Sequence, residues 1–192
     1  MNALPHFWAH HACIDLVNSR FADHLGSGAF YDRLPLREWR LAFLAHWGLL
    51  ETGAADEPEA VDALWGLRSA LRTLLEARSR REPLPVADVE ALNAAVAASP
   101  RTVRLQAPLA GRPRLVQAAI RPDWRWALAE VAASGARLLA GGEADRLRVC
   151  ANPDCSWMFY DASRGGSRRW CEAPICGSLI KVRRHRARQR AR

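Results

Sequence analysis

Four of the five cysteines fall within 27 residues near the C-terminus. They are Cys150, Cys155, Cys171 and Cys176. They form two C-x4-C pairs, and turn-forming residues lie inside each pair, Asn152 and Pro153 in the first and Pro174 in the second. Two turns that each offer two thiolates can surround one zinc ion tetrahedrally, with each sulfur about 2.3 Å from the metal. The spacing therefore predicts a four-cysteine zinc site.

Two disulfides or four free thiols are the alternatives for these cysteines. The first 20 residues lack the basic start, apolar run and cleavage site of a signal peptide, so we expect a cytoplasmic protein, in which disulfides are rare. Four thiolates would fill the metal shell and leave no position for a catalytic water. Asp161 is the one plausible base, and we interpret it as a partner in local hydrogen bonds. We therefore expect structural zinc, no catalytic residue and no enzyme activity.

Basic residues crowd the C-terminal end. Residues 162–192 hold ten Lys and Arg and one acidic residue, so this segment carries +9, whereas the other 161 residues sum to −1. Such asymmetry indicates a polyanionic partner. The residues predicted to bind nucleic acid are Arg168, Arg169, Lys181, Arg183, Arg184, Arg186 and Arg188. Duplex DNA is the expected partner, with RNA and a merely solvated tail as alternatives. Membrane binding is disfavoured because almost no apolar residue follows Val182.

Apolar residues at helical spacing predict four helices, over residues 36–50, 57–81, 86–98 and 122–140. The stripe of the first is Leu36, Trp39, Phe43, Trp47 and Leu50. The stripe of the second is Val61, Leu64, Trp65, Leu71 and Leu75. Asp56 and Asp123 are expected to cap the second and fourth helices. Gly141 and Gly142 are expected to end the fourth in the usual C-terminal way.

A pattern of period two at Val103, Leu105 and Ala107 predicts a strand. A turn over 110–113 then leads to a returning strand over 114–120. The predicted fold class is mainly α with a small β-hairpin (α+β). We expect a helical N-terminal domain over 1–142 and a small four-cysteine zinc finger with its arginine-rich tail over 147–192. No run approaches the roughly 18 apolar residues of a membrane span.

The N-terminal part offers weaker candidates for a site. Asp15 and Asn18 stand beside apolar residues and are candidates to line a small-ligand pocket; helix capping or a buried polar network is the alternative. Three histidines cluster nearby: His6, His10 and His11. Without an acidic partner close by, we do not predict a metal site there. We interpret Cys13 as a small, buried apolar residue.

A specific pattern runs through the finger: Cys150-x4-Cys155, Phe159-Tyr160-Asp161, Ser163, Ser167-Arg168-Arg169-Trp170-Cys171 and Cys176-Gly177. It resembles the CGNR zinc-finger family, whose four cysteines correspond to the four named above. Upstream, two apolar patterns resemble the ABATE domain: Ile14-Asp15-Leu16-Val17-Asn18-Ser19 and Phe43-Leu44-x-x-Trp47-Gly48-Leu49-Leu50. The resemblance implies a bacterial transcription regulator with a ligand-sensing helical domain and a finger that binds DNA.

One departure from the family pattern concerns its signature, which reads Cys176-Gly177-Ser178-Leu179 here instead of Cys-Gly-Asn-Arg. Ser178 can cap a following helix as the Asn would, but Leu179 cannot replace an arginine that touches phosphate. Two hypotheses follow. The first is a DNA-binding regulator with a small-molecule effector. The second is an enzyme or small-molecule-binding protein whose finger serves as a scaffold or as a dimerisation element, for instance of a homodimer.

Overall fold

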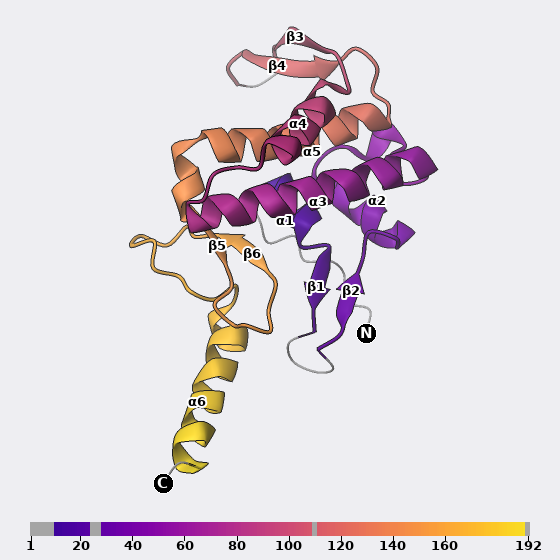
Figure 1. Ribbon diagram of the computed structural model, residues 1–192. Coiled ribbons are helices and arrows are strands. Elements are labelled where there is room, and N and C mark those ends of the chain that lie inside the picture. Colours follow the sequence, from indigo (N-terminus) through magenta and orange to yellow (C-terminus); the bar gives the residue numbers. More distant parts are fainter. Residues whose placement is uncertain (1–9, 24–27, 109–110, 191–192) are drawn as a thin grey trace.

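The computed structural model describes residues 10–23, 28–108 and 111–190. Its first half contains α1 (Ala12–Val17), β1 (Arg20–Ala22), β2 (Phe30–Asp32), α2 (Arg37–His46), the 3₁₀ turn η1 (Leu50–Thr52), α3 (Pro58–Arg80) and α4 (Val86–Ala97). The second half contains β3 (Arg101–Gln106), β4 (Arg114–Ala119), α5 (Trp124–Ala140), the 3₁₀ turn η2 (Gly142–Arg146), β5 (Leu147–Val149), β6 (Met158–Tyr160), the π-turn η3 (Ala173–Gly177) and α6 (Ser178–Arg190). Figure 1 shows the arrangement.

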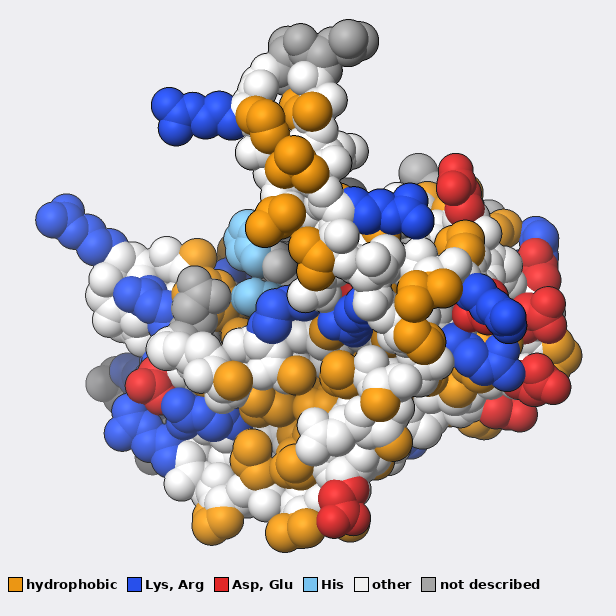
Figure 2. All heavy atoms as spheres, turned by 90° about the horizontal axis from the view of Figure 1, so that it is seen from above, with side chains coloured by type: hydrophobic (Ala, Val, Ile, Leu, Met, Phe, Trp, Pro, Cys, Tyr) orange, Lys and Arg blue, Asp and Glu red, His pale blue; other side chains and the backbone are white. Residues whose placement is uncertain are grey.

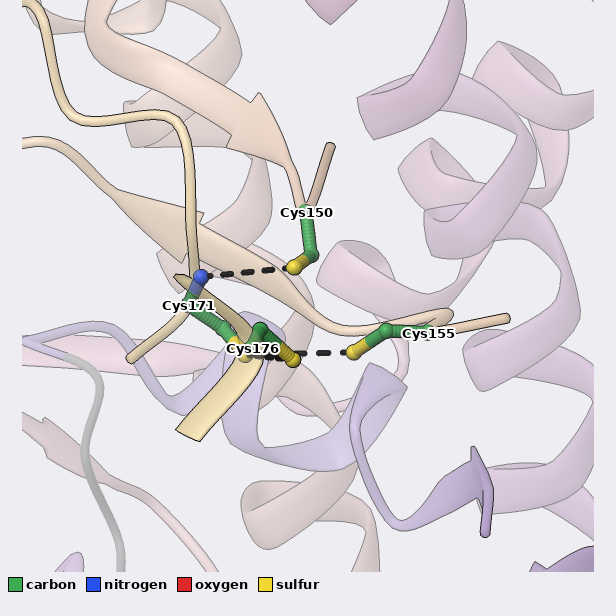
Figure 3. A group of neighbouring side chains, drawn as sticks. All are labelled: Cys150, Cys155, Cys171 and Cys176. Atoms are coloured by element: carbon green, nitrogen blue, oxygen red, sulfur yellow. Dashed lines mark hydrogen bonds between the residues drawn. The ribbon is translucent and has the colours of Figure 1, made fainter. Parts of the chain in front are cut away.

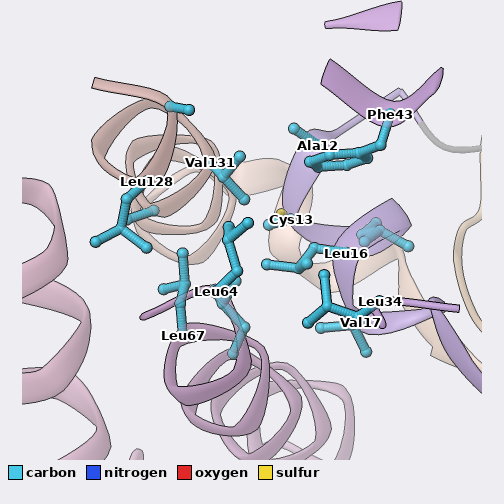
Figure 4. Close-up of a cluster of buried hydrophobic side chains, with 14 of the residues drawn as sticks. Ala12, Cys13, Leu16, Val17, Leu34, Phe43, Leu64, Leu67, Leu128 and Val131 are labelled. Carbon is cyan, nitrogen blue, oxygen red and sulfur yellow. The ribbon is translucent and has the colours of Figure 1, made fainter. Parts of the chain in front are cut away.

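The core lies between α1, α3 and α5. Leu64 and Leu67 of α3 face Leu128 and Val131 of α5, and the short buried helix α1 lies beside them (Figure 4). Gly135 makes this close approach feasible, because a Cβ there would lie 2.4 Å from a methyl carbon of Leu71. α3 and α5 supply many of the buried apolar side chains, and burial of apolar surface is the main favourable term in folding. The expected mainly α fold is confirmed.

The helix predicted over 36–50 is shorter in the structure. α2 ends at His46, and Gly48 follows with φ +68, a left-handed conformation that turns the chain away from the helix axis. Trp39 and Phe43 are buried as expected. Leu36 and Leu50, at the two ends of the predicted stripe, are both 46% exposed, because the helix does not extend to carry them onto its inner face.

In α3, two details of the prediction are wrong. The N-cap residue is Glu57, without a side-chain cap, because the carboxylate of Asp56 pairs with Arg37. Trp65 is 45% exposed, whereas Leu64 is buried. Adjacent helical residues point about 100° apart, so only one of the two can occupy the inner face.

The fourth predicted helix is α5. Its predicted cap is confirmed, since the Asp123 carboxylate accepts a hydrogen bond from the backbone N–H of Arg125 at 2.9 Å. Its predicted end is wrong, because Gly141 has φ −81 and ψ 156, an extended conformation, instead of the left-handed one of a glycine C-cap. The chain then continues directly into η2.

The predicted hairpin is β3–β4, with six antiparallel residue pairs. Part of its turn, Ala110, lies outside the described residues. Two further hairpins were not expected, β1–β2 and β5–β6, each with strands of three residues. Strands this short carry no detectable alternation. Among the described residues, no helix is long and apolar enough to cross a membrane.

The β5–β6 hairpin belongs to the same hydrophobic core as the helices. Leu147 and Met158 are at most 1% exposed and pack with the core residues of α3 and α5. Val149 and Tyr160 add partly buried contacts to it. The first elements of the finger are therefore built onto the helical body, and they position the cysteines that follow.

Candidate metal centre and arginine helix

The first cysteine pair is held by the loop between β5 and β6. Cys150 directly follows β5, and its N–H donates to the carbonyl of Trp157 at 2.9 Å, which closes the loop. Inside it, the backbone carbonyl of Asn152 accepts from the N–H of Cys155 at 2.9 Å. The Asn152 side-chain oxygen also accepts from the N–H of Asp154 at 3.2 Å. This is the turn expected at Asn152-Pro153, and it brings the two thiols together.

The second pair is returned to the first by a loop built around Asp161. Its carboxylate is fully buried and accepts from the N–H of Ser163 at 2.9 Å and from that of Arg168 at 2.8 Å. Burial alone raises the pKa of Asp161, but the hydrogen bonds from Ser163 and Arg168 outweigh it, so this pKa lies below its usual value. Asp161 therefore makes local hydrogen bonds, as interpreted from the sequence.

All four sulfur atoms meet at one place (Figure 3). Their Sγ atoms lie within 4.8 Å of one another. Cys171 Sγ is 3.8 Å from Cys155 Sγ and 3.6 Å from Cys176 Sγ. Four sulfurs at about 2.3 Å from a central ion, at the corners of a tetrahedron, would be about 3.8 Å apart. The donor set and its spacing thus fit a metal ion with the ligand preferences of zinc.

Hydrogen bonds support the sulfurs from outside. The side-chain amide of Asn152, which is fully buried, donates to Cys176 Sγ at 3.6 Å, and the N–H of Cys171 donates to Cys150 Sγ at 3.5 Å. Donors aimed at sulfur stabilise the thiolate form. Such outer contacts also orient metal ligands. The sequence analysis treated Asn152 only as a turn former, and no spacing rule identifies its second role.

The titration of these thiols shows why the cluster suits a cation. Hydrogen bonding to Cys150 raises the pKa of Cys155 to about 12, and the pKa of Cys171 is raised as well by its bonds to Cys150 and Cys155. Burial raises the pKa of Cys176. Only Cys150, which receives those hydrogen bonds, has a lowered pKa. Thiols this close to one another oppose one another's ionisation, and a divalent cation would favour the thiolate form of all four.

A close contact shapes the start of the last helix. A Cβ on Gly177 would lie 3.0 Å from Cδ1 of Trp170, so only glycine fits under this indole without displacing it. η3 carries Cys176 and Gly177 into α6, and Leu179 at its base is half-buried. The expected cap is wrong: Ser178 lies within this continuous turn, and its hydroxyl donates to the carbonyl of Ala173 at 3.5 Å.

The arginine-rich segment forms a helix that follows the last cysteine. α6 contains no buried residue, and residues 181–190 are all exposed. In Figure 1 the helix projects from the finger away from the helical body. Of the basic residues predicted to bind nucleic acid, five are exposed and their charged groups form no ion pair or hydrogen bond with the described part of the chain: Arg169, Lys181, Arg184, Arg186 and Arg188.

The other two predicted residues are engaged inside the finger. The guanidinium of Arg168 donates to the carbonyl of Trp170 at 2.9 Å and to that of Cys171, and it lies 4.6 Å from the ring centroid of Phe159. Arg183 forms an ion pair with Asp154 and so ties α6 to the first cysteine loop. Both side chains stabilise the module that carries the helix.

Asp15 lies within α1, Asn18 ends it, and each is 5% exposed. Asp15 Oδ2 accepts from the indole N–H of Trp47 at 3.2 Å. Asn18 Nδ2 donates to the carbonyl of Met158 at 2.8 Å, and the N–H of Met158 donates back to Asn18 Oδ1 at 2.9 Å. Both side chains thus take part in buried polar contacts, which is the alternative to a ligand pocket given above for Asp15 and Asn18.

A cavity of about 400 Å³ lies beside α1 and α5. It is lined by His10, His11, Ala12, Trp47, Leu49, Glu130, Ser134, Arg137 and Leu138. Two of the clustered histidines thus face it, whereas His6 lies outside the described residues. Sequence reasoning did not identify the cavity, because its residues come from three separate segments.

Family models match both parts of the chain. Residues 146–189 match the CGNR zinc finger, the region that holds the four cysteines and α6. Residues 10–142 match the ABATE family, which is described as "Putative stress-induced transcription regulator". No curated protein matches the chain. The ABATE match covers more than half of the sequence, and the cysteine cluster marks a metal-binding site within the CGNR match. The chain therefore belongs to the ABATE family and carries a CGNR zinc finger.

Proposed function

We propose that this protein is a transcription regulator that binds duplex DNA through α6, with one structural zinc ion held by the cysteine cluster. The ligands are Cys150, Cys155, Cys171 and Cys176, whose spacing fits a tetrahedral ion. When bound, the ion would link the two cysteine loops. It would have no open coordination position for a reaction, because the four thiolates complete its coordination shell. Its role is to hold Cys176 firmly, two residues before α6 begins.

The single observation that carries the proposal is the exposure of α6. Of the ten residues from Lys181 to Arg190, six are Lys or Arg, none is acidic and every one is exposed. Like charges along an exposed helix repel one another and destabilise the helix. This repulsion is relieved when phosphates neutralise the charges. An α-helix also fits the major groove of B-DNA.

Charge is distributed unevenly over the molecule. Figure 2 shows the face seen from the side opposite α6, and Asp and Glu side chains gather along one edge of it. Residues 178–190 contain no acidic residue. The electrostatic field of this charge distribution favours an approach in which the basic helix α6 meets a polyanion first.

Five residues make the proposed phosphate contacts. They are Arg169, Lys181, Arg184, Arg186 and Arg188. Arg168 and Arg183 are left out, because their guanidinium groups bind carbonyls and a carboxylate within the finger. Each phosphate neutralised contributes about −0.9 to the slope of log K against log salt, so these five contacts contribute about −4.5 to it.

The test is a salt titration of zinc-loaded protein with a labelled DNA duplex, followed by fluorescence anisotropy. We expect the triple variant Arg184→Gln, Arg186→Gln, Arg188→Gln to bind more weakly, with a slope reduced in magnitude by about 2.7. The matched control removes three exposed arginines from and beside the β3–β4 hairpin: Arg104, Arg112 and Arg121. Equal losses in both variants, or no binding by the wild type at low salt, would contradict the proposal.

Competition separates duplex DNA from RNA. Unlabelled duplex DNA should displace the probe at lower concentration than single-stranded RNA of the same length. A preference for the single-stranded RNA would contradict duplex DNA as the partner and assign the arginine helix to RNA instead.

A second proposal, small-molecule sensing, rests on the cavity beside α1. Of its lining residues, Ser134 and Arg137 offer donors, with Arg137 4.0 Å from the carboxylate of Glu130, and Trp47, Leu49 and Leu138 are apolar. The volume of about 400 Å³ falls in the range of small-ligand sites. We propose that it binds a small organic anion, whose carboxylate pairs with Arg137.

Thermal unfolding in the presence of aromatic and aliphatic monocarboxylates tests this second proposal. A carboxylate that binds only the folded protein raises its Tm. Arg137→Gln should abolish the increase, and Arg125→Gln, a half-exposed arginine on the same helix, should keep it. If no carboxylate raises the Tm, or both variants respond alike, the cavity does not hold such an anion.

A further inference from the structure

The β1–β2 hairpin exposes aromatic side chains that the core does not use. Phe30 is 62% exposed and Tyr31 is 50% exposed. Large apolar side chains that gather at one exposed place indicate a binding surface. The two residues lie on opposite faces of the hairpin, since neighbouring residues of a strand alternate in direction.

Each aromatic face is paired with an arginine. The guanidinium of Arg20 lies 5.1 Å from the ring centroid of Phe30. On the other face, Arg33 lies 4.5 Å from the centroid of Phe21, which stacks on Tyr31 at 5.7 Å. A guanidinium held over a ring keeps the donors at its edge available for a second partner.

Among the described residues, neither Arg20 nor Arg33 has a carboxylate oxygen within 4.0 Å. Asp32 is directly opposite Arg20 in the register, but its carboxylate binds Arg68 of α3, at 2.6 and 2.7 Å, and attracts Arg20 only at longer range. The hairpin therefore presents the exposed guanidinium group of Arg20 and the partly buried one of Arg33 beside two exposed rings.

The hairpin is fixed against the finger. The ring of Phe21 lies 6.1 Å from that of Trp157, which packs against the cysteine cluster. The N–H of Ala22 donates to the hydroxyl of Ser156 at 3.2 Å. Arg72 of α3 donates to the carbonyl of the same serine at 2.6 Å. The hairpin is thus connected through Ser156 and Trp157 to the loop that holds Cys155.

Figure 1 shows β1–β2 and α6 projecting from the body on the same side. The hairpin has the two chemical components that nucleic-acid surfaces combine, guanidinium groups for phosphates and aromatic rings for sugars and bases. Apolar side chains exposed on a projecting element can also enter a minor groove and press against a base step.

We propose that the β1–β2 hairpin is a second DNA-binding element, which contacts the duplex beside the site of α6. Arg20 and Arg33 bind phosphates, and Phe30 and Tyr31 pack against the minor groove. The inference rests on the proposed function, because it assumes that α6 binds the same duplex. It assigns part of the DNA interface to the ABATE part of the chain, which contains this hairpin.

Two double variants of the zinc-loaded protein test the inference by anisotropy with a labelled duplex. Arg20→Gln with Arg33→Gln should reduce the magnitude of the salt slope by about 1.8, because two phosphate contacts are lost. Phe30→Ser with Tyr31→Ser should weaken binding by about fivefold or more at unchanged slope, because ring contacts carry no charge. Far-UV circular dichroism and zinc content should match the wild type; if a double variant fails this check, Arg20→Gln and Tyr31→Ser alone are used.

Matched controls come from the β3–β4 hairpin at the other end of the molecule. Arg104→Gln with Arg112→Gln removes the same charge. Leu105→Ser with Leu115→Ser removes two apolar side chains that are 68% and 73% exposed. Both controls should bind DNA like the wild type.

The outcomes separate the two proposals. If the wild type does not bind duplex DNA at low salt, the proposed function fails. If the wild type binds and the α6 triple variant is weakened, but both β1–β2 variants keep wild-type affinity and slope, the second element is refuted. A change from dimer to monomer in light scattering, without a change in DNA affinity, would also refute it and assign the hairpin to contact between copies of the chain.

Discussion

Asn18 and Met158 are 140 residues apart in the sequence and exchange two hydrogen bonds, of 2.8 and 2.9 Å, between one side-chain amide and one backbone unit. The Asn18 side chain thus makes the two backbone hydrogen bonds that a neighbouring strand would otherwise make with Met158 of β6. Asn18 ends α1, one of the helices around the core, and Met158 begins the strand that follows the first cysteine pair. Helical body and finger are joined at this point by a buried polar contact.

Asn18→Ala should destabilise the protein by about 1–3 kcal/mol, because it leaves the buried N–H and C=O of Met158 without partners. Urea unfolding followed by far-UV circular dichroism measures the loss. Asn93→Ala serves as the control, since Asn93 is exposed on α4 and should change stability by less than about 0.5 kcal/mol. Equal effects of the two substitutions would show that the Asn18–Met158 contact carries no stability.

Removal of the metal should disorder the finger and leave the helical body folded. Trp157 and Trp170 pack against the cysteine cluster, whereas the main core contains neither. A strong chelator should therefore change tryptophan fluorescence and release the projecting helix, with only a small loss of helical signal. We expect one zinc per chain by elemental analysis and four additional thiols that react with a disulfide reagent after chelation.

Cysteine variants identify the ligands. Cys176→Ser should reduce bound zinc to well below one per chain, because the site loses one of four thiolates. Cys13→Ala is the control: this thiol is fully buried in the main core, and burial raises its pKa to about 11, so it is neither exposed nor ionised. A Cys13→Ala protein that loses its metal, or a Cys176→Ser protein that keeps it, would contradict the assignment.

The sequence was sufficient for features that depend on local spacing. The two C-x4-C pairs, the long helices α3 and α5, and the helix of the tail each have a signal within a short window. The cap at Asp123 is local in the same sense. Such features can be predicted because neighbours in the chain determine them.

Features that join distant segments could not be predicted in this way. The bond from Asn18 to Met158 and the pairing of Asp32 with Arg68 connect residues from separate elements, and no periodicity records them. Free charge is equally hard to infer: Arg183 and Arg184 are adjacent and identical in type, yet among the described residues only Arg183 pairs with a carboxylate. From composition alone, both arginines would be expected to bind phosphate. The structure shows that Arg184 is available and that Arg183 is paired with Asp154.

Gly177→Ala should disturb the start of α6. The new methyl group would lie about 3.0 Å from Cδ1 of Trp170, so the indole must move by several tenths of an ångström. We expect a shift of tryptophan emission and a loss of stability of about 1–2 kcal/mol, as for other small-to-large substitutions at a packed site. Gly165→Ala is the control, because its Cβ would meet only Ser167 Oγ, at 3.7 Å. A spectrum unchanged by Gly177→Ala would show that the indole is not packed there.

The pairing of Asp32 with Arg68 should make stability depend on pH. Burial alone raises the pKa of Asp32, but hydrogen bonds from Arg68 outweigh it, so the pKa lies below the ordinary value of 3.8. A carboxylate with a lowered pKa stabilises the fold above its ordinary pKa, and this contribution is lost as the pH falls through the lowered value. Asp32→Asn should therefore be less stable than the wild type at pH 6–7, and the difference should shrink below about pH 4.

Calorimetry of wild type and variant at each pH measures the difference in their stability. Metal release at low pH affects both proteins, so its effect largely cancels when the two stabilities are subtracted. Asp62→Asn is the control, since Asp62 is exposed on α3 and has no ion pair among the described residues. It should change stability little at any pH. A difference for Asp32→Asn that stays constant from pH 7 to pH 3 would show that the carboxylate charge does not hold the β1–β2 hairpin to α3. A difference that vanishes in acid would identify Arg68 as the anchor of that hairpin.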